Sequence, residues 1–257
     1  MVRTSYFSEK SYATSKLTFF TVQTVPHHPY GGQWFVLGPP SPPAAPRAAP
    51  ADANITLAAH TTDIFSLAAT QNVLFSASGS STINLHRIND ASGSFPISQS
   101  LTAHKLGCHH VATAPRGSNG TVAASVGFGG DIKVWRSNPD SGDFTLDYEI
   151  TPSEAKTKGV GDSWAVALSS DENYMACTTH DGKIHVWDLR SKSVVQTYET
   201  GGGGNGSFGL SVALSADGRL TASGHQNGSV YVFNNDAGHL KYSLSGKYPV
   251  CAGAWTS

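Results

Sequence analysis

The sequence contains little cysteine and little charge. Only three of its 257 residues are cysteine, and Cys108, Cys177 and Cys251 form no Cys-x-x-Cys pair. This excludes a disulfide framework and predicts a reducing compartment. Charged residues make up 14% of the chain, with 17 basic and 18 acidic side chains and a formal net charge of −1. Such a balance gives no electrostatic footprint for nucleic acid or an anionic membrane, so we expect protein partners and no direct nucleic-acid contact.

Long apolar runs are lacking as well. No stretch approaches the roughly 18 apolar residues that a membrane span needs, and the first residues are polar where a signal peptide would be apolar. The sequence therefore predicts no membrane association, and we expect a cytoplasmic and nuclear location.

A phrase of alternating apolar residues closes four segments of the chain. It ends in His86, Trp135, Trp187 and Phe233, which recur at intervals of about 50 residues. A four-stranded propeller blade takes roughly 40 to 45 residues, so the period predicts an all-β chain of stacked blades, a β-propeller. Short β-branched runs between turn signals favour the same fold, because consecutive antiparallel strands have this spacing.

The composition divides the chain into two parts. Residues 1–53 are rich in proline and alanine and are expected to be mostly disordered, because proline cannot donate backbone hydrogen bonds to a sheet. Residues 54–257 are expected to form a partial propeller, with 55–58 as a closing strand. The expected blades are 60–102, 104–150, 160–199 and 206–245, and a fifth blade begins near residue 250. Four blades form an open arc, so we expect an incomplete propeller with one exposed blade face.

Several phrases carry a family resemblance. Trp187-Asp188 follows an Asp-Gly turn and a third strand, and the phrases at 76–81, 103–110 and 222–230 are more specific. Over about residues 54–250 the chain resembles the fungal WD-repeat subunit of the superkiller complex. The resemblance implies a seven-bladed, non-enzymatic adaptor without a cofactor. It also implies binding to the tetratricopeptide scaffold beside the RNA helicase, support of exosome-mediated 3′–5′ mRNA decay, and a second role with the initiator of meiotic double-strand breaks.

Two other functions remain open at this stage. One is a chromatin or recombination factor that contacts nucleic acid, and the other is a generic WD-repeat substrate receptor. The chain has no Gly-x-Ser-x-Gly elbow and no recurring pair of carboxylates, so no catalytic residue is predicted.

WD repeats often contain a buried network of His, Ser or Thr, Asp and Trp. The second blade offers His104, Ser125 and Trp135, with Gly129 at the expected aspartate position. The third blade offers Thr179, Asp181 and Trp187 without a histidine before it. We therefore expect these residues to be structural, and we expect no blade to hold a complete network.

Two patterns suggest ligands but have simpler explanations. His104, Cys108, His109 and His110 are zinc-type ligands, yet adjacent strand residues point to opposite faces and cannot share one ion without distortion. Residues 204–209 match Gly-x-Gly-x-x-Gly, but a strand is expected after them where a dinucleotide site needs a helix. No metal or cofactor is predicted.

The candidate partner-binding residues lie where first strands begin, because the loops that lead into the blades gather at one rim of a propeller. Buried aromatic side chains supply most of the energy in a peptide-binding site. The alternative is that Phe65 and Trp164 fill the core between blades. The candidates are Asp63, Phe65, Lys105, His109, Trp164 and Phe208.

Overall fold

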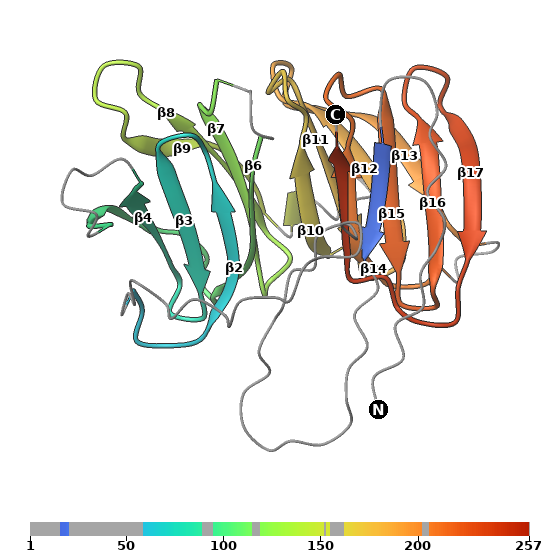
Figure 1. Cartoon of the computed structure of the whole chain (residues 1–257), viewed down its shortest axis with the longest axis horizontal. Helices are drawn as coiled ribbons and strands as arrows, with labels where there is room; N and C mark the ends of the chain where they lie inside the picture. Colours follow the sequence, from blue (N-terminus) through green and yellow to red (C-terminus); the bar gives the residue numbers. More distant parts are fainter. Residues whose placement is uncertain are drawn as a thin grey trace, which may run out of the picture.

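The computed structural model describes residues 16–20, 59–88, 95–114, 119–151, 153–154, 162–201 and 206–256. Most of them form four antiparallel sheets of four strands each, and in every sheet the strands follow one another in sequence order (Figure 1). This arrangement confirms the predicted all-β fold of stacked four-stranded blades.

The sixteen blade strands lie within the four expected blade ranges, four strands in each. Blade 1 is β2 (Ile64–Ala69), β3 (Val73–Ser78), β4 (Thr82–Arg87) and β5 (Ile97–Thr102); blade 2 is β6 (Cys108–Thr113), β7 (Val122–Gly127), β8 (Ile132–Ser137) and β9 (Phe144–Ile150); blade 3 is β10 (Ser163–Leu168), β11 (Tyr174–Thr179), β12 (Lys183–Asp188) and β13 (Ser193–Glu199); blade 4 is β14 (Gly209–Leu214), β15 (Leu220–His225), β16 (Ser229–Asn234) and β17 (His239–Ser245).

The turn between the second and third strands of blade 3 lies close to the loop that leads into blade 4. At this turn Gly182 adopts a φ of 81°, a conformation that L side chains rarely adopt. A Cβ added to Gly182 would lie 2.6 Å from the carbonyl oxygen of Ser207, in the loop that leads into blade 4. Glycine is therefore needed here both for the turn and for the approach of the next blade.

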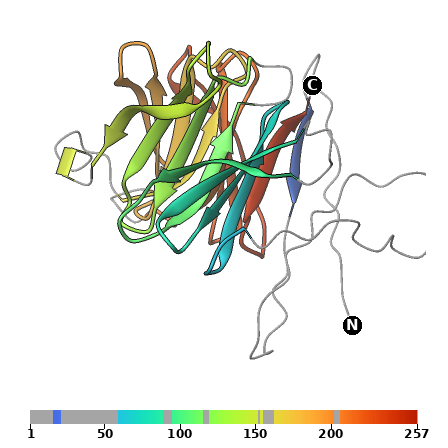
Figure 2. The same cartoon turned by 90° about the vertical axis from the view of Figure 1, so that its left-hand side faces the viewer.

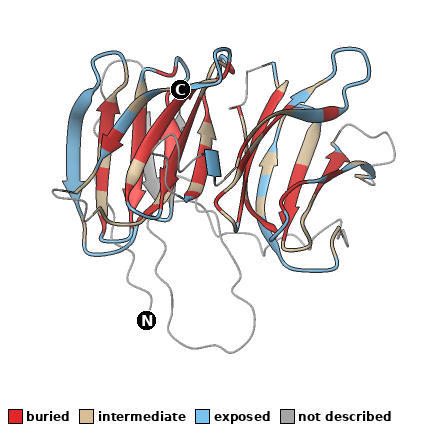
Figure 3. Cartoon of the chain, turned by 180° about the vertical axis from the view of Figure 1, so that it is seen from behind, coloured by how far each residue is buried: buried red, intermediate tan, exposed pale blue. Residues whose placement is uncertain are grey.

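The core consists of three apolar clusters, one between each pair of neighbouring blades. Val111, Val166 and Val212 occupy the same position in the first strands of blades 2, 3 and 4, and each is at most 8% exposed because it packs against the preceding blade. The equivalent residue of blade 1 is Leu67, which is 61% exposed. The inner strands are buried, whereas β17 is exposed along its whole length (Figure 3).

Every first strand contains an irregularity next to its beginning. The pairing of β2 with β3 passes from Ile64 to Ser66, so Phe65 is an extra residue with no partner on β3. The same shift involves His109 in blade 2, Trp164 in blade 3 and Leu210 in blade 4. Because a bulge re-aims the side chain of its extra residue, these four positions share one orientation relative to their blades.

A two-stranded ribbon lies beside blade 4. It pairs β1 (Lys16–Phe20) with β18 (Ala252–Thr256), and β18 lies next to β14 as the first strand of a fifth blade would (Figures 1 and 2). β1 belongs to the segment that was expected to be mostly disordered. The predicted closing strand 55–58 and the rest of residues 1–58, apart from β1, lie outside the described residues. In the part of the chain that the structure describes, no helix is long and apolar enough to cross a membrane.

Candidate functional site: an aromatic row across four blades

A buried polar chain supports the rim of blade 2. His104 lies in the loop before β6, and its Nε2 is 2.7 Å from Oγ of Ser125 on β7. Nε1 of Trp135 donates to the same hydroxyl oxygen at 2.9 Å. Nδ1 of His104 lies 2.6 Å from Oδ2 of Asp131. Blade 2 therefore holds a complete His–Ser–Trp–Asp network, and the expectation that it lacks the aspartate is wrong, because Asp131 supplies the carboxylate from two residues beyond Gly129.

Glycine at the end of β7 makes this network possible. A Cβ on Gly127 would lie 2.5 Å from Oδ1 of Asp131 and 2.7 Å from Cβ of His104. No side chain fits at this position without moving the polar chain.

Blade 1 builds a variant of the same chain. Oγ of Ser76 lies 2.8 Å from Nε2 of His60 and 3.2 Å from Nε2 of His86, which stands where blade 2 has tryptophan. Nδ1 of His60 faces Oγ1 of Thr82 at 3.5 Å, and Thr82 stands at the aspartate position. The carboxylate of Asp131 in blade 2 is thus replaced by the neutral hydroxyl of Thr82.

Blade 3 departs from the predicted network. Thr179 donates to Asp181 and also bonds to the backbone of Lys183, so these two side chains stabilise their own turn. Cys177 is the residue of blade 3 that corresponds to Ser125. Cys177 pairs with the residue two positions before Trp187, and Ser125 pairs with the residue two positions before Trp135. The histidine of blade 2 has its counterpart in a stretch outside the described residues.

Six aromatic side chains form a continuous row along the rim where the first strands begin. We call Phe65, Phe128, His109, Trp164, His180 and Phe208 the aromatic row. Adjacent ring centroids lie between 4.2 and 5.3 Å apart, from Phe65 against Phe128 at 5.0 Å to His180 against Phe208 at 4.3 Å. These spacings are those of edge-to-face and stacked aromatic pairs. The row spans all four blades, so it is a surface that no single blade could form.

His109 is the buried centre of the row. Its ring stacks on Trp164 at 4.2 Å and 26°, and it touches Phe128 at 5.1 Å. It is 8% exposed, and its Nε2 has no hydrogen-bond partner among the residues that the structure describes. Burial, together with the neighbouring histidines His110, His104 and His180, lowers its pKa to about 3. His109 is therefore neutral at physiological pH and packs as an aromatic ring.

The end of the row at blades 1 and 2 is the accessible one. Phe65 is 48% exposed and Phe128 is 44% exposed, whereas Trp164 and Phe208 are half-buried. Phe65 is thus a surface residue, and the alternative that it fills a core between blades does not hold in the described part of the chain. For Trp164 the alternative holds in part, because its side chain packs against the apolar cluster between blades 3 and 4.

Four of the six predicted partner-binding residues come together in the row. The other two, Asp63 and Lys105, are exposed in the loops before β2 and β6, at the same rim but without an aromatic contact. The prediction missed Phe128 and His180, which each stand directly after the second strand of their blade. The corresponding residues of blades 1 and 4 are Gly79 and Gln226, so this position shows no aromatic pattern in the sequence.

The two adjacent histidines of β6 face different surroundings. His109 enters the row, whereas Nδ1 of His110 accepts a hydrogen bond from the backbone N–H of Val166 on β10 at 3.2 Å. Burial lowers the pKa of His110 to about 4. Within the described ranges, no three His, Cys, Asp or Glu side chains are grouped to hold a metal ion. The Gly-x-Gly-x-x-Gly stretch leads directly into strand β14, so no helix follows it.

The repeat also matches a known sequence family. The WD40 family, described as WD domain, G-beta repeat, matches residues 153–188, which include the first three strands of blade 3. Residues 153–188 thus contain a WD repeat. Meiotic recombination protein rec14 of Schizosaccharomyces pombe is 37% identical to this chain over 190 residues, which are 73% of this chain and 57% of rec14.

Two further proteins are similar over shorter stretches. WD repeat-containing protein SL1-17 of Schistosoma mansoni is 28% identical over 139 residues, 54% of this chain and 40% of SL1-17. The human U3 small nucleolar RNA-associated protein 18 homolog is 32% identical over 73 residues, 28% of this chain and 13% of that protein. The chain thus spans little more than half the length of rec14, and less of the other two.

Proposed function

We propose that this protein is a non-catalytic WD-repeat scaffold that acts in meiotic recombination and binds protein partners through the aromatic row. The observation that supports this most strongly is the row itself, a joined set of rings with exposed phenylalanines at blades 1 and 2. Exposed aromatic groups over a rigid support are typical of protein-binding hot spots. The recombination role is inferred from the similarity to rec14. A role in recombination implies a nuclear location, and we propose the nucleus for this protein.

The test is affinity purification of the tagged protein from meiotic fission-yeast cells, followed by mass spectrometry. We expect a defined set of partners with the unaltered chain and their loss with the double variant Phe65→Ala, Phe128→Ala. Leu146→Ala, Val195→Ala is the matched control, because these exposed apolar residues lie on the outer strands β9 and β13. Retention of all partners by the row variant would contradict the proposal.

We further propose, on the sequence phrases at 76–81, 103–110 and 222–230, that the protein belongs to a superkiller-type complex. It would then bind the tetratricopeptide scaffold beside the RNA helicase in the cytoplasm, support 3′–5′ mRNA decay by the exosome, and also assist the initiator of meiotic double-strand breaks, within a seven-bladed ring. Co-purification of the scaffold from vegetative cells tests this role separately from recombination. Absence of the scaffold, with meiotic partners still present, would leave only the recombination role.

The balanced charge argues against nucleic acid as the direct partner. Salt-sensitive retention of the purified protein on DNA or RNA would contradict this expectation.

A further inference from the structure

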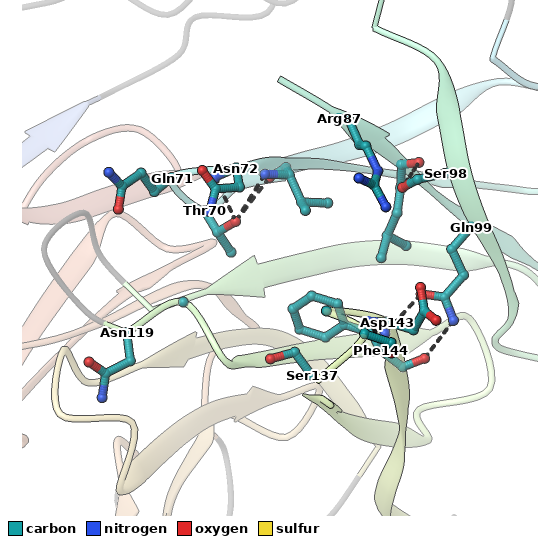
Figure 4. Close-up of a pocket in the computed structure, with 15 residues that line it drawn as sticks. Thr70, Gln71, Asn72, Arg87, Ser98, Gln99, Asn119, Ser137, Asp143 and Phe144 are labelled. Carbon is teal, nitrogen blue, oxygen red and sulfur yellow. Dashed lines mark hydrogen bonds between the residues drawn. The ribbon is translucent and has the colours of Figure 1, made fainter. Parts of the chain in front are cut away.

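A polar groove lies between blades 1 and 2 at the rim opposite the aromatic row. It is a cavity of about 400 Å³, bounded by the turn after β2, the ends of β4 and β5, and the turn between β8 and β9 (Figure 4). Side chains that line it include Gln71, Arg87, Ser98, Asn119 and Asp143. The volume lies within the range of roughly 300 to 1,000 Å³ that is typical of ligand sites.

The floor of the groove is preformed. Nε2 of Gln99 donates to the carbonyl oxygen of Phe144 at 2.7 Å, and Oε1 of Gln99 accepts from the N–H of Phe144 at 2.8 Å. These two hydrogen bonds join blade 1 to blade 2 in the same way that backbone groups join paired strands. The ring of Phe144 is buried. A ligand would therefore meet a surface that needs no rearrangement.

The neighbouring junction shows what this groove lacks. Between blades 2 and 3, the carboxylate of Asp147 pairs with Nε of Arg136 at 3.2 Å and with Nζ of Lys192 at 3.0 Å. Asp147 is the extra residue of a bulge, because Val134 pairs with Tyr148 and the next residue of β8 pairs with Leu146. One carboxylate thus joins two cations across that junction.

Ser98 occupies the equivalent bulge in blade 1, because Leu85 pairs with Gln99 and His86 pairs with Ile97. Arg87 follows His86 as Arg136 follows Trp135, so Arg87 is the counterpart of Arg136. Ser98 donates its hydroxyl to the carbonyl oxygen of Leu85 at 3.2 Å and brings no charge. Among the described residues no carboxylate lies within 4.0 Å of the Arg87 guanidinium, so its cation has no ion-pair partner there.

We propose that this groove binds an extended segment of a partner protein through an acidic side chain whose carboxylate pairs with Arg87. The ligand carboxylate would supply what Asp147 supplies at the next junction. The side-chain amides of Gln71 and Asn119 face the same cavity and are suited to the main chain of such a segment. Asp143 lies on the opposite wall and repels a second acidic group, which limits the ligand to one carboxylate at this point.

The experiment is an NMR titration of the isotopically labelled full chain with a blocked peptide, acetyl-Gly-Ser-Glu-Ser-Gly-amide. We expect chemical-shift changes at the Arg87 side chain and at the backbone of residues 70–73 and Gly142. The matched peptide with glutamine in place of glutamate should bind more weakly, by up to about fivefold, as expected when one exposed ion pair is lost. Equal shifts with both peptides, or shifts confined to the aromatic row, would overturn the proposal.

Two substitutions of one residue separate charge from shape. Ser98→Asp places a carboxylate where Asp147 stands in blade 2, so it should pair with Arg87 and abolish the glutamate preference while the protein remains folded. Ser98→Asn has a similar size without the charge and should keep the preference. Binding of the glutamate peptide that persists unchanged in Ser98→Asp would contradict the proposal. A third peptide carries phosphoserine in place of glutamate. If only this peptide binds, the groove recognises a phosphate and not a carboxylate, and the proposal is overturned as well.

Discussion

Asp131 holds Nδ1 of His104 at 2.6 Å, and this contact turns three separate side chains of blade 2 into one buried network. His104 is 1% exposed, and Asp131 reaches it from the start of the third strand. His109 lies at the start of β6, shortly after His104 in the chain, and Phe128 follows Gly127, which lies against both His104 and Asp131. The polar network of blade 2 thereby supports the centre of the aromatic row.

Replacing Asp131 should measure this support. We expect Asp131→Asn to lower the free energy of unfolding by about 1–3 kcal/mol, because it weakens a charge-assisted hydrogen bond to a buried group. Urea denaturation monitored by tryptophan fluorescence gives the value. The control is Asp140→Asn, an exposed turn residue, with an expected change within about 0.5 kcal/mol. Equal effects of the two variants would show that the network contributes nothing particular.

The same pair predicts the behaviour in acid. Burial raises the pKa of Asp131, but the hydrogen bond and the charge of His104 outweigh it, so the pKa lies below its usual value of 3.8. The stabilisation by this carboxylate is therefore fully present above that value and is lost as the pH falls through the lower folded pKa. The difference in stability between the unaltered chain and Asp131→Asn should shrink below pH 4.

His109 should remain neutral at pH values far below the usual pKa of histidine. Burial and the adjacent histidines lower its pKa from 6.5 to about 3, so the folded state resists a proton that the unfolded state accepts. This contribution to stability is present above pH 6.5 and declines as the pH falls from 6.5 towards 3. NMR titration of the ring carbons, assigned with His109→Gln, checks it. A titration midpoint near 6.5 in the folded protein would contradict the buried, stacked position.

Equivalent residues of blades 1 and 2 should differ sharply in their effect on stability. Val111→Ala removes two methyl groups from a site that is 2% exposed and should cost about 1.5–3 kcal/mol. Leu67→Ala alters a side chain that is 61% exposed and should change stability by less than about 0.5 kcal/mol. Thermal unfolding of both variants tests this. A large loss for Leu67→Ala would mean that another part of the protein covers this face of blade 1.

The three thiols should also react at different rates. Burial raises the pKa of Cys108 to about 12 and that of Cys177 to about 11, and both side chains are fully buried, whereas Cys251 is exposed. At pH 8 an aromatic disulfide reagent should modify Cys251 first and reach the other two only upon unfolding. Rapid reaction of all three thiols in the native protein would contradict the burial of the blade cores.

The strands were predictable because the alternation of apolar residues has the period of a half-buried strand, and the turns carry Gly at fixed places. Phe65, His109 and Trp164 were found as rim residues from their place at the start of first strands. Their shared orientation was not predictable, since it depends on bulges that a period of two does not reveal.

The polar network was missed for a related reason. In blade 3 the turn aspartate, Asp181, precedes Gly182, so the sequence suggested the same order in blade 2. There Asp131 follows Gly130, and it faces His104 only because the hairpin and Gly127 bring the loop before β6 close. In blade 3 the sequence suggested Thr179 as the counterpart of Ser125, because the network is expected to contain Ser or Thr. The strand pairing shows that the counterpart is Cys177.

The most direct test of the proposed function is recombination frequency in fission yeast. In a chimera, the part of rec14 that matches this chain is replaced by the corresponding residues of this chain and expressed in cells without rec14. We predict that the chimera supports meiotic recombination, that Phe65→Ala, Phe128→Ala abolishes this support while the protein stays folded, and that Leu146→Ala, Val195→Ala retains it. Full recombination with the row variant would contradict a partner-binding role for the aromatic row.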